Sequence, residues 1–132
     1  MITGDHPRTA QRIARDLGIP LDDRNIVTGM ELDQLTDDDV SQIAAHAGVF
    51  ARVTPEHKLR IVRALQRDGE VVAMTGDGVN DAPALRAADI GVAMGRGGTD
   101  AARQAATLIL ADDDIATVVA AIRHGRGIVD NI

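Results

Sequence analysis

The chain lacks cysteine, tryptophan and tyrosine, and Phe50 is its only aromatic residue. The absence of cysteine excludes disulfide bonds and thiolate metal sites. With 132 residues, the chain is long enough to bury the core of one domain, and that core must be aliphatic. No apolar run approaches the roughly 20 residues that span a membrane, so the composition predicts a soluble domain.

An excess of positive charge is also lacking. The formal net charge is −6, and the 14 basic residues are scattered among acidic ones. This distribution argues against a surface for nucleic acid or an anionic membrane. Thirteen of the basic residues are arginines, and the remaining one is Lys58. Because an ammonium is a compact point charge that suits a phosphate, Lys58 is a candidate anion-binding residue.

The sequence is organised around the segment Thr75–Leu85, which reads TGDGVNDAPAL. Before it, Glu70–Met74 is a short apolar run rich in β-branched residues, which is typical of a buried strand. After it, Ala82–Ala88 consists of helix formers, with Pro83 in the first turn and Asp81 placed to cap the helix. The pattern predicts a strand, a loop and a helix at the sheet edge where ligands bind in parallel α/β folds.

This loop concentrates oxygen-bearing side chains, namely Asp77, Asn80 and Asp81. Gly76 and Gly78 allow the backbone to approach a ligand closely. Hard oxygen ligands suit Mg²⁺, which takes one or two carboxylates together with water and phosphate oxygens. The alternative is a capped turn whose aspartates only accept hydrogen bonds from backbone amides. The number of ligands in so short a loop favours the metal site.

Hydrophobic periodicity and stop signals divide the rest of the chain into alternating strands and helices. Helices are predicted at Pro7–Leu17, Asp37–Ala47, Thr54–Asp68, from Thr99 or Asp100 to Ala106, and from Asp112–Asp114 onward to Ile132. Strands are predicted at Met1–Ile2, Gly48–Arg52, Ile90–Met94 and Thr107–Leu110. The segment Ile19–Leu35 is predicted to be irregular apart from a helical turn at Met30–Leu35. Such alternation indicates a three-layer, Rossmann-like α/β fold with a mostly parallel sheet.

Acidic and histidine residues elsewhere carry weaker signals. The run Asp37–Asp39 lies at a predicted helix start, where it complements the helix dipole, so it is interpreted as a cap and not as a metal site. The four histidines show no arrangement for a nucleophile and are predicted to lie on the surface. Of these, His6 and His57 lie nearest the candidate site, and His46 and His124 lie elsewhere.

Three loops are predicted to converge, because the carboxyl ends of parallel strands share one edge of a sheet. Thr3, Gly4 and Asp5 offer a hydroxyl and backbone amides to a phosphoryl oxygen. Lys58 lies near the start of a helix, where the helix dipole also favours an anion, and Asp77 belongs to the cation site. A phosphate-binding hydroxyl, a lysine and Mg²⁺ carboxylates together indicate phosphoryl transfer. The sequence contains no evident nucleophile for it.

Five segments resemble, in order and spacing, the phosphorylation domain of P-type cation-transporting ATPases, most of all the calcium-pump-like members. They are Met1–Asp5 (MITGD), Phe50–Lys58 (FARVTPEHK), Met74–Leu85 (MTGDGVNDAPAL), Ala88–Gly95 (ADIGVAMG) and Leu110–Asp113 (LADD). The resemblance covers nearly the whole chain. It implies a haloacid-dehalogenase-like fold and a function in which ATP hydrolysis drives ion transport through an aspartyl-phosphate.

The resemblance also implies roles for the loop residues. Thr3 would bind the phosphoryl group and Lys58 would neutralise it. Asp77 would ligate Mg²⁺ with support from Asn80 and Asp81.

The remaining implied roles concern the nucleotide, the phosphate loop and the membrane. Gly4 and Asp5 would shape the phosphate loop, and Arg52 would lie near ATP. The final helix, Asp113–Ile132, resembles the segment that leads into the membrane stalk. The resemblance therefore implies a cytoplasmic domain of an integral membrane protein, which we expect in a bacterial plasma membrane.

One part of the family pattern is missing from this sequence. The family's nucleophile is the aspartate of an Asp-Lys-Thr-Gly-Thr segment, and no such segment occurs here. We therefore expect residues 1–132 to form a partial phosphorylation domain, truncated at the nucleophile strand and inactive alone. Its partners would be the nucleotide-binding, actuator and membrane domains of the same polypeptide.

The family's nucleophile strand is central, between the strands that match those ending here at Ile2 and Met74. Its loss would leave unpaired edges, so a strand-exchanged homodimer is one hypothesis. Two other functions stay open at this point. One is a fragment of a soluble haloacid-dehalogenase-type phosphatase, and the other is a non-catalytic module that binds Mg²⁺ or phosphate.

Overall fold

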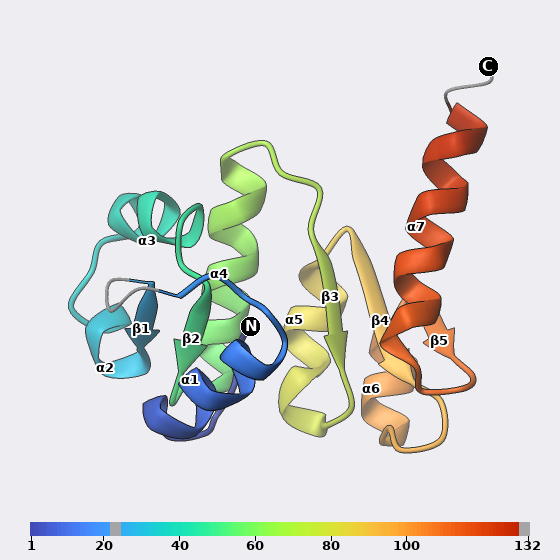
Figure 1. Ribbon diagram of the computed structural model, residues 1–132, viewed down its shortest axis with the longest axis horizontal. Helices are drawn as coiled ribbons and strands as arrows, with labels where there is room; N and C mark the ends of the chain where they lie inside the picture. The colour runs from blue at the N-terminus through green and yellow to red at the C-terminus, as the bar shows by residue number, and fades with distance from the viewer. Residues whose placement is uncertain (22–24, 130–132) are drawn as a thin grey trace.

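Helices and strands alternate along the chain in the computed structural model, which describes residues 1–21 and 25–129 (Figure 1). The helices are α1 (Pro7–Asp16), α2 (Gly29–Leu32), α3 (Asp37–Ala44), α4 (Pro55–Arg67), α5 (Ala82–Ala87), α6 (Asp100–Ala105) and α7 (Ile115–Val129), with a 3-10 helix η1 (Val79–Asp81) before α5. The strands are β1 (Ile26–Thr28), β2 (Val49–Ala51), β3 (Ala73–Gly76), β4 (Ile90–Met94) and β5 (Leu108–Leu110).

The strands form two parallel sheets. One has the order β1-β2, and Ile2 adds a parallel bridge to Phe50 on the other side of β2. The second has the order β3-β4-β5, with Thr75 opposite Val92 and Ala93 opposite Ile109. Within the described residues, no strand pairing joins Ile2 to β3. The predicted parallel α/β architecture is confirmed.

Helix α4 connects the two halves of the molecule. Its Ile61 packs into the aliphatic core over β1 and β2, whereas its Val62 packs into the core over β3 and β4. A third cluster, which includes Ala14 of α1, covers the opposite face of the β1-β2 sheet. Because α4 contributes to two cores, the first turn of this helix holds a fixed position relative to both sheets.

Local sequence signals mark the helix ends. Gly18 and Gly69 follow α1 and α4 with φ angles of 71° and 85°, in the left-handed region that favours glycine. Thr36 and Thr54 begin α3 and α4 with reciprocal capping boxes. Asp39 accepts hydrogen bonds from both the amide and the hydroxyl of Thr36, so the interpretation of the acidic run as a cap is confirmed.

Two strand predictions were wrong in part. Residues 26–28 were expected to be irregular but form β1, because this short segment pairs along its length with β2. The strand expected at Glu70–Met74 begins three residues later, at Ala73, and Val71 is 78% exposed. Val71 and Val72 precede the paired segment, so the apolar run placed the predicted strand too early. The helix prediction for residues 130–132 falls outside the described residues.

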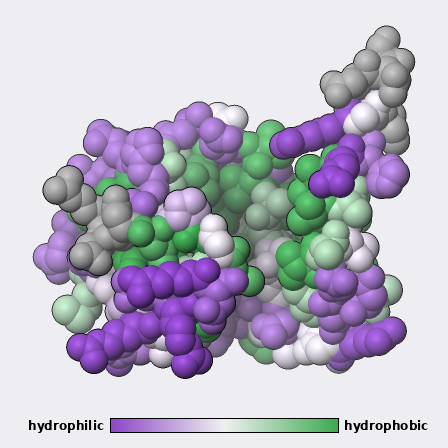
Figure 2. Space-filling view, viewed as in Figure 1, coloured by the Kyte–Doolittle hydropathy of each residue, from purple (hydrophilic) through white to green (hydrophobic). Residues whose placement is uncertain are grey.

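One face of the β3-β4-β5 sheet is covered less than the other. Helices α5 and α6 pack on one face, whereas a groove of about 890 Å³ separates the opposite face from α7. Val71 and Leu108 lie in this groove and are 78% and 54% exposed. Figure 2 shows hydrophobic side chains in the hollow between the two halves of the molecule. Among the described helices, none is both long and apolar enough to cross a membrane.

Candidate functional site

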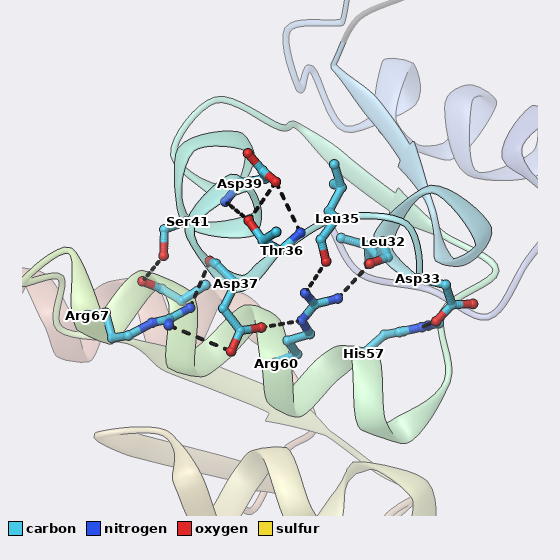
Figure 3. Close-up of polar contacts among 11 residues, drawn as sticks. Leu32, Asp33, Leu35, Thr36, Asp37, Asp39, Ser41, His57, Arg60 and Arg67 are labelled. Atoms are coloured by element: carbon cyan, nitrogen blue, oxygen red, sulfur yellow. Dashed lines mark hydrogen bonds and ion pairs between the residues drawn. The ribbon is translucent and has the colours of Figure 1, made fainter.

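The position of α4 is fixed by a forked contact with the stretch from the end of α2 to the start of α3 (Figure 3). Arg60 donates from Nη1 to the carbonyl of Leu32 at 2.6 Å and from Nη2 to the carbonyl of Leu35 at 2.5 Å. Its Nε donates to the Asp37 carboxylate at 2.7 Å. A planar guanidinium can make these three bonds at once, so Arg60 ties the middle of α4 to the neighbouring layer.

The first turn of α4 is fixed by His57. This side chain is buried, its Nδ1 accepts a hydrogen bond from the amide of Thr54, and its Nε2 lies 2.8 Å from the Asp33 carboxylate. The prediction of a surface histidine is therefore wrong for His57, because the ring closes the capping box of α4. His6, by contrast, is exposed and caps α1 by accepting from the amide of Arg8. His57 holds the helix turn from which Lys58 projects.

Lys58 forms an ion pair with Asp81 across the two halves of the molecule. Its Nζ lies 2.5 Å from Oδ1 of Asp81, and the two side chains are only 17% and 10% exposed. Burial alone would raise the pKa of Asp81, but the hydrogen bond from Lys58, with further ones from backbone amides, outweighs it and lowers the pKa below its ordinary value. Asp81 is therefore held in the charged form.

The second carboxylate oxygen of Asp81 organises the loop after β3. It accepts hydrogen bonds from the amide of Gly78 at 3.1 Å and the amide of Asp77 at 3.3 Å. A Cβ added at Gly76 would come within 2.5 Å of the Asp81 Cβ, so only glycine allows this close approach. The prediction that the Asp81 side chain caps α5 is wrong, because it makes no cap bond there. It turns back to the loop and to Lys58.

Asp77 lies exposed in the same loop, and its backbone carbonyl accepts a hydrogen bond from the amide of Thr99 at 2.8 Å. Within residues 1–21 and 25–129, its carboxylate takes part in no hydrogen bond or ion pair. Asn80 is exposed in η1. No cluster of three or more His, Cys, Asp or Glu side chains suited to a metal occurs in this part of the chain. Mg²⁺ requires only one or two carboxylates beside water and phosphate oxygens, so an open carboxylate with an amide nearby fits it.

The loop after Ile2 lies against the loop after β2. The amide of Thr3 donates to the carbonyl of Phe50 at 2.9 Å, and the amide of Arg52 donates to the carbonyl of Asp5 at 3.0 Å. The hydroxyl of Thr3 donates to the Asp5 carboxylate at 3.0 Å, and Gly4 between them is exposed. Arg52 has a φ of 51°, which costs a non-glycine residue about 1–3 kcal/mol. The strained Arg52 thus lies between β2 and α4 and contacts the loop after Ile2 through Asp5.

The structure brings the predicted residues together in two groups. One group contains Lys58, Asp77 and Asp81, and the other contains the Thr3–Asp5 loop and Arg52. The segment from β2 to the first turn of α4 connects them along the chain. No hydrogen bond or ion pair within the described residues joins the two groups directly.

Sequence reasoning missed the residues that hold these loops. The buried role of His57 and the amide of Thr99 could not be inferred from composition. Asp113 was noted within a matching segment and at the start of the final helix, yet its carboxylate accepts hydrogen bonds from three successive amides of the Gly95–Gly97 loop. The available signal was the glycine-rich sequence of residues 95–98, because the backbone amides of such a loop can converge on an anionic acceptor.

Comparison with known proteins identifies the family of the chain. A sequence model described as haloacid dehalogenase-like hydrolase matches residues 1–89, and a second model of the same description matches residues 58–122. Over its whole length the chain is 54% identical to calcium-transporting ATPase 1 of Saccharomyces cerevisiae and 57% identical to the probable cation-transporting ATPase F of Mycobacterium tuberculosis. It spans only 14% and 15% of these relatives.

A solved structure gives the same answer for the fold. The crystal structure of a zinc-transporting PIB-type ATPase in the E2.Pi state aligns with 98% of this chain and 17% of its own, with a TM-score of 0.70 and 33% identity. The family-model match covers more than half of the chain. The chain therefore belongs to the haloacid dehalogenase-like hydrolase family, and its similarity to cation-transporting P-type ATPases extends over its whole length.

Proposed function

We propose that this chain forms the Mg²⁺- and phosphoryl-binding part of the phosphorylation domain of a cation-transporting P-type ATPase. The whole protein would couple ATP hydrolysis to ion transport through an aspartyl-phosphate. The observation that carries the proposal is the 2.5 Å ion pair between Lys58 and Asp81 beside the open carboxylate of Asp77. It brings one ammonium and two carboxylates from separate elements to one corner, which is the charge arrangement that phosphoryl transfer needs.

In this proposal Lys58 neutralises the phosphoryl group, and the Thr3 hydroxyl turns its single proton from the Asp5 carboxylate to a phosphoryl oxygen. Gly4 and Asp5 shape the loop that presents the Thr3 hydroxyl, as the hydrogen bond from the amide of Asp5 to the Thr3 hydroxyl oxygen at 3.1 Å supports. Arg52, which follows β2, donates its amide to the carbonyl of Asp5 in this loop and has an exposed side chain, and we assign it to the neighbourhood of ATP. Positioning and charge stabilisation are the main tasks of such residues.

The Mg²⁺ ion would be held by Asp77, with Asn80 as a second oxygen ligand. Asp81 would support the ion indirectly, by holding the loop that carries Asp77, because its oxygens already accept hydrogen bonds from Lys58 and from two loop amides. When bound, Mg²⁺ supplies positive charge to the phosphoryl oxygens. The chain's own contribution is a loop conformation that keeps the Asp77 carboxylate open.

The aspartate nucleophile would come from another part of the longer polypeptide. This chain spans 14% and 15% of its relatives and contains no Asp-Lys-Thr-Gly-Thr segment. Ile2 and β3 each carry an edge that no other described strand pairs. A parallel strand placed between them would satisfy both edges. We propose that the nucleophile strand takes this place.

A titration with Mg²⁺ and beryllium fluoride, a phosphoryl mimic, tests the site. We expect the NMR amide signals of Thr3, Lys58 and Asp77 to shift together on addition of both. Asp77→Asn should remove the response, whereas Asp38→Asn, an exposed aspartate on α3, should leave it intact. If Asp77 responds to Mg²⁺ alone and the other two signals stay unchanged, the phosphoryl site requires the missing strand. If none of the three responds, the proposal is wrong.

The isolated chain should not phosphorylate itself, because it contains no nucleophile in the family's position. Incubation with labelled ATP and Mg²⁺, followed by acid quenching, should leave no bound label. Acid-stable phosphate that hydroxylamine removes would show an acyl-phosphate and would contradict this expectation.

Partners and location follow from the same proposal. The nucleotide-binding, actuator and membrane domains of the same polypeptide would surround this chain, which would lie on the cytoplasmic side of a membrane. Helix α7 would lead toward the stalk, and Figure 1 shows it rising beyond the sheet. Without these domains, the open edges of Ile2 and β3 offer a route to a strand-exchanged homodimer. Sedimentation at high concentration should then show dimers, and a purely monomeric profile would contradict this.

A further inference from the structure

We infer that Asp113 is a positioning residue for Asp77, acting through the loop that follows β4. The inference rests on the proposed Mg²⁺ role of Asp77. Oδ1 of Asp113 accepts from the amides of Gly95 at 2.7 Å and Arg96 at 3.0 Å, and Oδ2 accepts from the amide of Gly97 at 2.7 Å. Three successive amides that converge on one carboxylate form an anion-binding concavity, and here the anion belongs to the chain itself.

The geometry of Asp113 is specific to this contact. Its φ is 57°, in the left-handed region that aspartate and asparagine tolerate better than most residues. The bonds from the loop lower its pKa below the ordinary value, those from Arg96 and Gly97 most of all. The carboxylate therefore stays charged and keeps all three amides at neutral pH.

The carbonyl side of the same loop is held by Arg103. Its Nη1 donates to the carbonyl of Gly95 at 3.2 Å and also to the carbonyl of Gly98, and its Nη2 donates to the Asp100 carboxylate at 2.5 Å. A Cβ at Gly98 would lie 2.1 Å from the carbonyl of Met94, so the loop lies tightly against the end of β4. Both sides of the loop backbone are thus restrained.

The restrained loop ends at Thr99, whose amide donates to the backbone carbonyl of Asp77 at 2.8 Å. Asp81 accepts a hydrogen bond from the amide of the same residue at 3.3 Å. The backbone of Asp77 is therefore fixed at both its amide and its carbonyl. Release of Asp113 would loosen the carbonyl contact and allow the direction of the carboxylate to vary.

Asp113 also lies two residues before α7 (Ile115–Val129). Its neighbour Asp112 accepts from the hydroxyl of Thr117 at 2.7 Å, which fixes the start of this helix. The path from α7 to the site therefore consists of Asp113, the Gly95–Thr99 loop and Asp77. Asp113 therefore affects the orientation of Asp77 without itself contacting Mg²⁺ or the phosphoryl group.

The test compares Asp113→Asn with Asp114→Asn in the full chain. Asparagine keeps the size and the tolerance for positive φ but loses the charge. Asp114 is a matched control, because among residues 1–21 and 25–129 its carboxylate accepts only from the amide of Ala116 at the start of α7. Two quantities are measured on the folded proteins, namely the Mg²⁺ dissociation constant, followed at the amide of Asp77, and the hydrogen-exchange rate of the amide of Thr99.

We expect Asp113→Asn to weaken Mg²⁺ binding about tenfold, as residues behind metal ligands commonly do, and to accelerate exchange at Thr99 about tenfold or more. Asp114→Asn should change both by less than about twofold. A role confined to stability would lower the urea midpoint of Asp113→Asn and leave both quantities unchanged, which would overturn the inference.

Two further outcomes concern Mg²⁺ binding by the wild-type chain and the folding of Asp113→Asn. If the wild-type chain does not bind Mg²⁺, the proposed function fails, and exchange at Thr99 still decides whether Asp113 holds the loop. If Asp113→Asn does not fold, Gly97→Ala replaces it, because its Cβ would lie 3.3 Å from Oδ2 of Asp113 and would displace the carboxylate. The same changes in Mg²⁺ affinity and Thr99 exchange are then expected, in smaller measure, and their absence overturns the inference.

Discussion

Removal of the Lys58 ammonium should destabilise the chain, and its effect should depend strongly on whether Asp81 is present. The two side chains are 17% and 10% exposed and lie 2.5 Å apart, so water screens the pair little. A hydrogen bond to a charged group contributes about 1.5–3 kcal/mol. Lys58→Met retains most of the aliphatic stem, so we expect it to lower the free energy of unfolding by this amount. Asp81→Asn should cost at least as much, since it also weakens the bonds from the amides of Asp77 and Gly78.

A double-mutant cycle separates the pair from these other effects. Urea unfolding of the wild type, Lys58→Met, Asp81→Asn and the double variant gives the coupling energy directly. We expect about 1.5–3 kcal/mol at pH 7. A coupling below about 0.5 kcal/mol would place the pair among exposed ion pairs of little consequence and would refute the argument from burial.

The coupling should also depend on pH in a defined direction. The pKa of Asp81 is lowered from its ordinary value of 3.8, so its contribution to stability is present above that pH and is lost as the pH falls through the lower folded value. The difference in stability between wild type and Lys58→Met should therefore be constant near neutrality and shrink in acid as Asp81 takes up a proton. A difference that persists unchanged in acid would show that lost packing, and not the ion pair, causes the destabilisation.

Two other substitutions test the framework around the site by urea unfolding. Arg60→Lys should lower the free energy of unfolding by about 1–3 kcal/mol, because lysine cannot serve the Leu32 and Leu35 carbonyls and Asp37 together; an unchanged midpoint would contradict the forked contact. Gly91→Ala should cost about 2–3 kcal/mol, because its Cβ would lie 2.3 Å from the carbonyl of Leu85. Gly4→Ala, which has open space around it, should change stability by less than about 0.5 kcal/mol and serves as the control.

Local signals explain which parts of the fold could be predicted. The strand Ile90–Met94 was predicted with its observed bounds, since a continuous apolar segment followed by glycine marks a buried parallel strand. The start of α4 was predicted from Thr54 and Pro55, whose cap and fixed φ act within one turn. Such signals require no knowledge of distant residues.

Long-range contacts explain what could not be predicted. Lys58 and Asp81 are 23 residues apart in sequence, and so are Arg60 and Asp37. Whether an aspartate caps its own helix or turns toward a lysine depends on how two helices pack, which no local pattern encodes. β3 was misplaced for a related reason, because Val72 is buried before the pairing with β4 begins.

The two aspartates of the loop differ in charge environment although both carry the same carboxylate. Asp81 is buried and neutralised by Lys58, whereas Asp77 is exposed and keeps its negative charge unpaired within the described residues. A divalent cation can therefore bind Asp77 without displacing the lysine. In the proposed function a phosphoryl group attracts Lys58 away from Asp81. The coupling energy between Lys58 and Asp81 should consequently decrease when beryllium fluoride is bound and stay unchanged with Mg²⁺ alone, because only the anion competes for the ammonium.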